Sequence, residues 1–131
     1  MDTESNMKKV ISTNKAPSAI GPYNQAILSN NTLYCSGQIA INPETGNLVI
    51  DNVTNETTQV MKNILEVLKA AGMDFRNVVK STIFMKNMND YSKINKVYST
   101  FFSEKPPARE AIQVSGLPKN VNIEISVIAV K

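Results

Sequence analysis

The sequence predicts an α+β protein. Residues 54–71 repeat apolar side chains at helical spacing, and residues 121–130 alternate apolar and polar side chains as a strand does. Weaker signals complete the order strands, helix, strand, helix, strands. The 131 residues contain no linker or repeat, so we expect residues 9–131 to form a single domain behind a flexible tail, residues 1–8.

The first elements are expected to be an irregular lead-in and a hairpin. Proline and glycine residues punctuate the chain up to residue 22. Residues 23–29 and 32–36 are then predicted to be short strands, because Ser29-Asn30-Asn31 between them is a turn signal. A second turn at residues 42–46 leads the chain toward the long helix.

The long helix, residues 54–71, has recognisable ends. Asn52 or Thr54 can cap its first turn, and Gly72 stands where a left-handed C-terminal cap belongs. Its apolar stripe consists of Val60, Ile64, Val67, Leu68 and Ala71.

The second half of the chain predicts two more strand regions around a shorter helix. Residues 78–86 are β-branched and apolar, which favours a strand. Residues 90–102 predict a helix with Asn89 as its N-cap. Strands at 109–115 and 121–130 close the chain.

The last strand is apolar on both faces. Ile123 and Ile125 lie on one face, and Ile128 and Val130 extend the other. A strand of this kind is usually covered on both sides. Two helices can cover only one face of the sheet, so we expect an oligomer.

The composition excludes several kinds of active site. There is no histidine, and Cys35 is the only cysteine. Ser-His-Asp and Cys-His catalysis therefore cannot be assembled within one chain, and a structural zinc site lacks its ligands. No Gly-rich phosphate loop or membrane-length apolar run is present.

The net charge of +3 comes from scattered lysines, which do not favour nucleic-acid binding. The polar N-terminus resembles no targeting segment, so we expect a cytoplasmic protein.

Arg109 and Glu124 are the leading candidates for a functional site. Arg109 follows two prolines at the start of a strand, and its planar guanidinium suits a carboxylate or phosphate. Glu124 stands between two isoleucines, where it could activate a water as a general base. A surface ion pair and a solvated carboxylate are the simpler interpretations of the two residues.

Other residues are weaker candidates. The hydroxyl of Tyr23 could reach a ligand, although a packed ring with an exposed tip is the commoner arrangement. Gly37 follows Ser36 at a strand end, where a glycine permits close approach of a ligand or forms a bulge. Asn89 is first a helix cap and only second a ligand contact. Cys35 is most simply a core residue.

Together these segments resemble the RidA/YjgF family of reactive-imine deaminases, from about Ile11 to Val130. The last matching segment contains the hallmark of the family, an arginine after a Pro-Ala step and a glutamate fifteen residues later. The segments are APSAIGPYNQAI at 16–27, CSGQIAINPETGNL at 35–48, AAG at 70–72, VKSTIFMKNMNDY at 79–91 and PPAREAIQVSGLPKNVNIEISVIAV at 106–130.

The resemblance implies a chorismate-mutase-like fold, with a mixed sheet backed by two helices. It also implies a homotrimer whose sheets face inward, with three clefts at the subunit interfaces. The activity would be hydrolysis of 2-imino acids, such as 2-iminobutanoate and 2-iminopropanoate, to 2-keto acids and ammonia. No cofactor or metal is implied. Pyridoxal-phosphate enzymes that dehydrate threonine or serine would supply the substrates.

The resemblance also implies roles for individual residues. Arg109 matches the carboxylate-binding arginine, Glu124 the glutamate that positions the hydrolytic water, and Tyr23 the tyrosine of the cleft. The positions matching the pocket lining are Ser36, Gly37 and Asn89.

The chain departs from the family pattern directly after the arginine. A small residue and a cysteine are common there, whereas this chain has Glu110 and Ala111. Ala111 is expected on the same face as Arg109, in the pocket wall, and Glu110 on the opposite face. Glu110 could instead bend back and neutralise Arg109, which would weaken carboxylate binding.

Two other functions stay open at this point. Some relatives of the family have been described as translation-inhibiting ribonucleases, and an RNA-binding surface would show steep salt dependence. A non-catalytic carboxylate-binding or chaperone-like module would use the same cleft without turnover.

Overall fold

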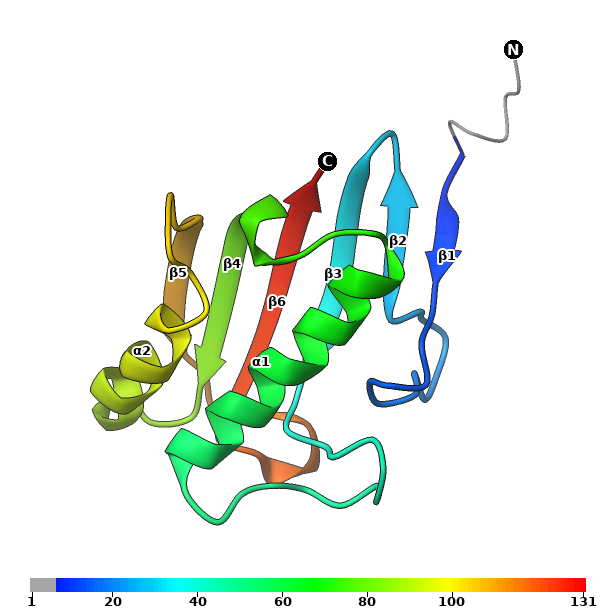
Figure 1. Cartoon of the computed structure of the whole chain (residues 1–131). Helices are drawn as coiled ribbons and strands as arrows, with labels where there is room; N and C mark the ends of the chain where they lie inside the picture. Colours follow the sequence, from blue (N-terminus) through cyan, green and yellow to red (C-terminus); the bar gives the residue numbers. More distant parts are fainter. Residues whose placement is uncertain (1–6) are drawn as a thin grey trace.

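Six strands form one mixed sheet, and two helices cover one of its faces (Figure 1). The structure, a computed structural model, describes residues 7–131, so residues 1–6 of the expected tail lie outside the described residues. The expected α+β class is confirmed. The strands are β1 (Lys9–Ile11), β2 (Ala26–Ser29), β3 (Thr32–Gln38), β4 (Val78–Met85), β5 (Ala108–Gln113) and β6 (Ile123–Val130). The helices are α1 (Val53–Ala70) and α2 (Tyr91–Ser99), and the short 3-10 turns are η2 (Phe75–Asn77), η3 (Met88–Asp90) and η4 (Pro118–Asn120).

The last strand in the chain, β6, lies inside the sheet between β3 and β4. The strand order is β1-β2-β3-β6-β4-β5, and only β4 and β5 are parallel. A parallel pair requires a crossover connection, which here contains α2. β5 is therefore an edge strand, and this arrangement places Arg109 beside α2.

The long helix packs its apolar stripe against the sheet as expected. The buried members of the stripe are Val60, Ile64, Val67, Leu68 and Ala71. Asn52 is confirmed as the N-cap, because its Oδ1 accepts a hydrogen bond from the backbone N of Asn55 at 2.8 Å. Gly72 has a φ of +73°, the left-handed conformation expected after the helix.

The lead-in contains a strand that the sequence did not indicate. β1 pairs antiparallel with β2, and Val10 lies opposite Ile27. Three residues are too few to display an alternating pattern, so only the pairing with β2 defines this strand. The hairpin of β2 and β3 is present, although β2 begins at Ala26 rather than at residue 23.

The second helix begins differently from the prediction. Asn89 is not its N-cap, because Asn89 lies inside η3, which directly precedes α2, and Asp90 occupies the N-cap position of α2. Asn87 caps η3 instead, and its Oδ1 accepts a hydrogen bond from the backbone N of Asn89 at 2.9 Å. The last two strands are also shorter than predicted, because β5 ends at Gln113 and β6 begins only at Ile123. The 3-10 turn Pro118–Asn120 lies in the connection between them. Within residues 7–131, no helix is both long and apolar enough to cross a membrane.

The face of the sheet opposite the helices is uncovered in a single chain. The large apolar side chains exposed on it are Val10, Tyr34, Ile112 and Val130, with exposed fractions between 39% and 53%. Val10 pairs with Ile27, and Tyr34 pairs with both Ile27 and Ile128, so an apolar row crosses four strands. Such a face supports the expectation of an oligomer.

Candidate functional site

The guanidinium of Arg109 is held by side chains of α2. Its Nη1 donates a hydrogen bond to Asn95 Oδ1 at 2.7 Å, and its Nη2 donates one to Tyr91 Oη at 2.6 Å. The ring centroid of Tyr98 lies 5.0 Å from Arg109 Cζ, within cation–π range. Arg109 is thus a half-buried side chain with a defined position rather than a free surface charge.

No acidic side chain among residues 7–131 forms an ion pair with Arg109. Its two partners are neutral, and a guanidinium has five N–H donors, so charge and donors both remain available. A cleft of about 450 Å³ lies beside it. The cleft is lined by Asn95, Tyr98, Ser99, Phe102, Pro106, Pro107 and Arg109. A partly desolvated cation without a counter-ion favours binding of an anion.

Glu124 occupies a second cleft, whose shape depends on Gly37. β3 has a bulge between Cys35 and Gln38, and this brings Gly37 against the Glu124 side chain. A Cβ at Gly37 would stand 2.6 Å from Glu124 Oε2, which is closer than atoms can approach. The bulge interpretation of Gly37 is confirmed. The group that approaches Gly37 in the structure is the side chain of Glu124, so close approach of a ligand stays a prediction.

The second cleft combines a carboxylate with an apolar wall. Its volume is about 280 Å³. Its lining is Pro17, Ser18, Ala19, Ile20, Tyr23, Gln25, Gly37, Gln38, Ile39, Ile41, Pro118, Lys119 and Glu124. Burial raises the pKa of the Glu124 carboxyl above its ordinary value. A carboxyl with a raised pKa is better suited to exchange protons with a water near neutral pH.

Three of the expected site residues therefore share this cleft, Tyr23, Gly37 and Glu124. Ser36 lies in neither of the two cleft linings, and its hydroxyl donates to the backbone O of Asn24 at 2.6 Å. Asn89 is exposed in η3 and also lies in neither lining.

The residues after Arg109 take opposite directions, as strand alternation predicts. Ala111 shares the face of Arg109 and packs against the hydrophobic core. Glu110 lies on the uncovered face, where Lys80 Nζ donates to its Oε1 at 2.6 Å. Glu110 therefore does not bend back, and the charge of Arg109 is not neutralised by its neighbour.

Arg109 and Glu124 lie on opposite faces of the sheet. Ser81 pairs with Arg109 and accepts a hydrogen bond from Tyr98, so all three share the helix-covered face. Glu124 alternates with the buried Ile123 and points to the uncovered face. The two residues are also far apart within the sheet. Arg109 on β5 and Glu124 on β6 are two strands apart across the sheet and three residues apart along the strand direction. At standard sheet spacings this separates their Cα atoms by about 14 Å. Within one chain, Arg109 and Glu124 therefore line two separate clefts rather than one pocket.

The residues of α2 that contact Arg109 were not identified from the sequence, namely its hydrogen-bond partners Tyr91 and Asn95 and the ring of Tyr98. Tyr91, Asn95 and Tyr98 recur at positions i, i+4 and i+7, which places them on one face of α2. That spacing was visible in the sequence, but polar side chains on a helix usually face water. Only the packing of α2 beside β5 gives them a partner.

A buried glutamate that was also missed positions the strand of Glu124. Glu56 of α1 is fully buried, and its Oε2 accepts hydrogen bonds from the backbone N of Asn122 at 2.8 Å and of Ile123 at 3.3 Å. These bonds connect the start of β6 to the first turn of α1. The position of Glu124 therefore depends on a second carboxylate outside its own cleft.

The fold and the two clefts define an α+β protein with a half-buried arginine that has no acidic partner among residues 7–131 and a glutamate whose pKa is raised by burial. Within that class, the chain belongs to the endoribonuclease L-PSP family, whose sequence profile matches residues 13–131. The expected relationship to the RidA/YjgF proteins is confirmed.

Similar proteins carry several names. A mouse protein named 2-iminobutanoate/2-iminopropanoate deaminase is 50% identical over 125 residues, covering 95% of this chain and 93% of the mouse protein. A Lactococcus lactis protein named as a regulator, AldR, is 54% identical over 121 residues, covering 92% of this chain and 96% of that protein. The crystal structure of E. coli TdcF with bound serine is 38% identical with a TM-score of 0.90, covering 94% of this chain and 98% of TdcF.

Proposed function

We propose that this protein hydrolyses 2-imino acids, such as 2-iminobutanoate and 2-iminopropanoate, to 2-keto acids and ammonia. The observation that carries the proposal is the half-buried guanidinium of Arg109, which has neutral partners and no counter-ion within the described chain. A substrate carboxylate would supply that counter-ion. The 50% identity to a mouse protein named as such a deaminase supports the same reaction.

In the proposed reaction, Arg109 binds the carboxylate of the substrate. Glu124 accepts a proton from a water molecule while the oxygen of that water attacks the carbon of the protonated imine. The adduct carries a hydroxyl and an amino group on one carbon. Glu124 returns its proton to the nitrogen, the C–N bond breaks and ammonia leaves, and the hydroxyl group gives its proton to Glu124 as the C=O group forms. The imine is already electrophilic, so orientation and proton transfer supply most of the help needed. Dehydratases that use pyridoxal phosphate would be the source of the substrates.

We propose further that the working unit is a homotrimer with composite sites. The separation of Arg109 and Glu124 on opposite faces supports this, because only another copy can bring the two together. β5 is an edge strand, so Arg109 is accessible to a neighbour, and the apolar row on the uncovered face offers a surface to bury. The remaining expected contacts are Tyr23, Ser36 and Gly37 on the glutamate side, and Asn89 and Ala111 on the arginine side.

The test couples the protein to a threonine dehydratase in a buffer containing semicarbazide. The protein should divert imine from the trap and increase the yield of keto acid. Arg109→Ala should abolish this effect while the oligomer stays intact. Arg76→Ala is the matched control, because Arg76 is the only other arginine and pairs with Asp74 on the surface. Failure of the unmodified protein to compete with the trap would refute the proposal.

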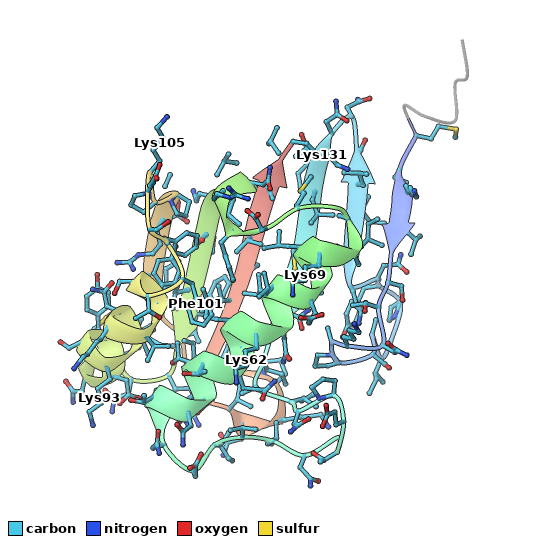
Figure 2. The ribbon with its side chains drawn as sticks, viewed as in Figure 1. Lys62, Lys69, Lys93, Phe101, Lys105 and Lys131 are labelled. Carbon is cyan, nitrogen blue, oxygen red and sulfur yellow. The ribbon has the colours of Figure 1, made fainter. Side chains whose placement is uncertain are left out.

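The two alternatives have separate signatures. Carboxylate binding in calorimetry without any imine turnover would favour a non-catalytic module. An RNA-directed role would require binding that weakens steeply with salt. The labelled lysines do not gather in one patch, since Figure 2 shows them spread over α1, α2, the turn before β5 and the end of β6.

A further inference from the structure

We infer that the hydroxyl of Tyr91 is a positioning group that holds the guanidinium of Arg109 ready for the substrate carboxylate. The inference deepens the proposed function and rests on it. It is carried by the hydrogen bond from Arg109 Nη2 to Tyr91 Oη, 2.6 Å long. The ring of the same tyrosine contributes a second contact, with its centroid 5.6 Å from Arg109 Cζ.

Tyr91 provides one of two holding points. Asn95 accepts from Nη1 and Tyr91 accepts from Nη2, so each terminal nitrogen has its own acceptor. Two acceptors on different nitrogens define the plane of the guanidinium, whereas one acceptor leaves it free to rotate about the remaining bond. Bidentate recognition of a carboxylate depends on that plane, because both N–H···O bonds must form together.

Tyr91 holds the guanidinium without neutralising it. A phenol oxygen accepts a hydrogen bond but carries no charge at neutral pH, unlike the aspartate or glutamate that commonly orients an arginine. Two of the five N–H donors are used, which leaves Nε–H and one N–H on each terminal nitrogen. The full positive charge and a pair of donors thus remain for the ligand.

The hydroxyl has little to contribute to the fold itself. Tyr91 is half-buried at the first position of α2, and its ring packs against the core. Arg109 is the only hydrogen-bond partner of its hydroxyl among residues 7–131. Removing the oxygen while keeping the ring therefore separates positioning of Arg109 from packing of the helix.

The experiment compares Tyr91→Phe with the unmodified protein. The Kd for 2-ketobutyrate, measured by calorimetry, should rise about three- to tenfold, the cost of ordering one long side chain during binding. KM for the imine should rise in parallel, while kcat stays within about twofold. The melting temperature and oligomeric state should not change. Ser92→Ala is the matched control, since it removes an exposed hydroxyl from the next residue of α2.

Two results would overturn the inference. One is an unchanged Kd in Tyr91→Phe. The other is a lowered melting temperature with an equal loss for the neutral ligand 2-ketobutyramide, because a structural role would not distinguish carboxylate from amide. Either result leaves the proposed function standing if Arg109→Ala still abolishes binding. If the unmodified protein binds no keto acid and diverts no imine, the proposed function itself fails.

Discussion

Gly37 and Glu124 are in direct contact across β3 and β6. A Cβ built on Gly37 would lie 2.6 Å from Glu124 Oε2 and 2.8 Å from its carboxyl carbon. The missing side chain at position 37 is therefore a condition for the present position of the carboxylate. The bulge between Cys35 and Gln38 creates this contact, because it shifts the register of β3 against β6.

Gly37→Ala should displace the Glu124 carboxylate and lower kcat/KM for imine hydrolysis by about tenfold or more, since small misplacements of a catalytic group cost large factors in rate. Steady-state assays of the purified oligomer measure this. Gly116→Ala is the control, because a Cβ at Gly116 meets nothing within 4 Å. Full activity in Gly37→Ala would show that the position of Glu124 is not critical.

Asn95→Asp should weaken keto-acid binding by about tenfold or more, because a carboxylate 2.7 Å from Arg109 Nη1 would neutralise it without changing the shape of the site. Calorimetry with 2-ketobutyrate provides the measurement. Asn47→Asp makes the same charge change in an exposed turn and should bind normally. Equal affinities for the two variants would argue against carboxylate binding at Arg109.

Glu124→Gln should abolish turnover and stabilise the fold at neutral and alkaline pH. The pKa of this carboxyl is raised by burial, so the folded state binds the proton more tightly than the unfolded state. The tighter proton binding stabilises the folded state fully at a pH below the ordinary pKa of a glutamate. This stabilisation is lost as the pH rises through the raised pKa of Glu124 in the folded state. The melting temperature of Glu124→Gln should thus exceed that of the unmodified protein at about pH 8 and match it at about pH 4.

The titration of the Glu124 carboxyl also predicts how activity depends on pH. A general base must be deprotonated, so kcat/KM of the unmodified protein should fall as pH decreases through the raised pKa of Glu124. Glu44→Gln, a change at an exposed turn, should leave both the melting curves and this profile unaltered. A melting temperature of Glu124→Gln that is lower at every pH would contradict the assigned effect of burial.

Gln25→Glu should destabilise the wall of the Glu124 cleft. The Nε2 of Gln25 donates to the backbone O of Thr13, Ala16 and Pro17, and its Oε1 accepts from Thr13 N. A carboxylate cannot donate, so carbonyl oxygens would face a negative charge, at a cost of about 1–3 kcal/mol in unfolding free energy. Denaturant titration measures the change.

Gln113→Glu is the informative comparison for that variant. Gln113 Oε1 only accepts a hydrogen bond, from the backbone N of Met88 at 2.7 Å, and a glutamate can do the same. Its stability should therefore stay within about 0.5 kcal/mol of the unmodified protein. A similar loss of unfolding free energy in Gln25→Glu and Gln113→Glu would mean that the added charge, rather than the lost hydrogen-bond donors, destabilises the protein.

Elements with strong local patterns could be predicted from the sequence. α1 spans 18 residues with a continuous apolar stripe and recognisable caps, and β6 alternates over its whole length. β1 has three residues and no pattern of its own, so its existence depends on pairing with β2. The cap of α2 was wrongly assigned to Asn89, because Asn89 lies inside the 3-10 turn η3 that directly precedes the helix, and Asp90 occupies the cap position of α2.

The candidate site could be predicted in its parts but not in its arrangement. Arg109, Glu124, Tyr23 and Gly37 were singled out from their residue types and from the family resemblance, and the structure brings the last three into one cleft. Asn95 was missed because a polar residue on a helix has no partner until that helix is packed.

By itself, the sequence determined the α+β class, the long helix, the alternating last strand and the residue types that carry charge. Those properties follow from local periodicity and from side-chain chemistry. Only the tertiary structure decided that Arg109 and Glu124 lie on opposite faces, and that Tyr91 and Asn95 hold the guanidinium. The physical reason is that the packing of the helices decides which face of each strand is buried. The register of β5 and β6 against β4 then decides which of their side chains are neighbours across the sheet.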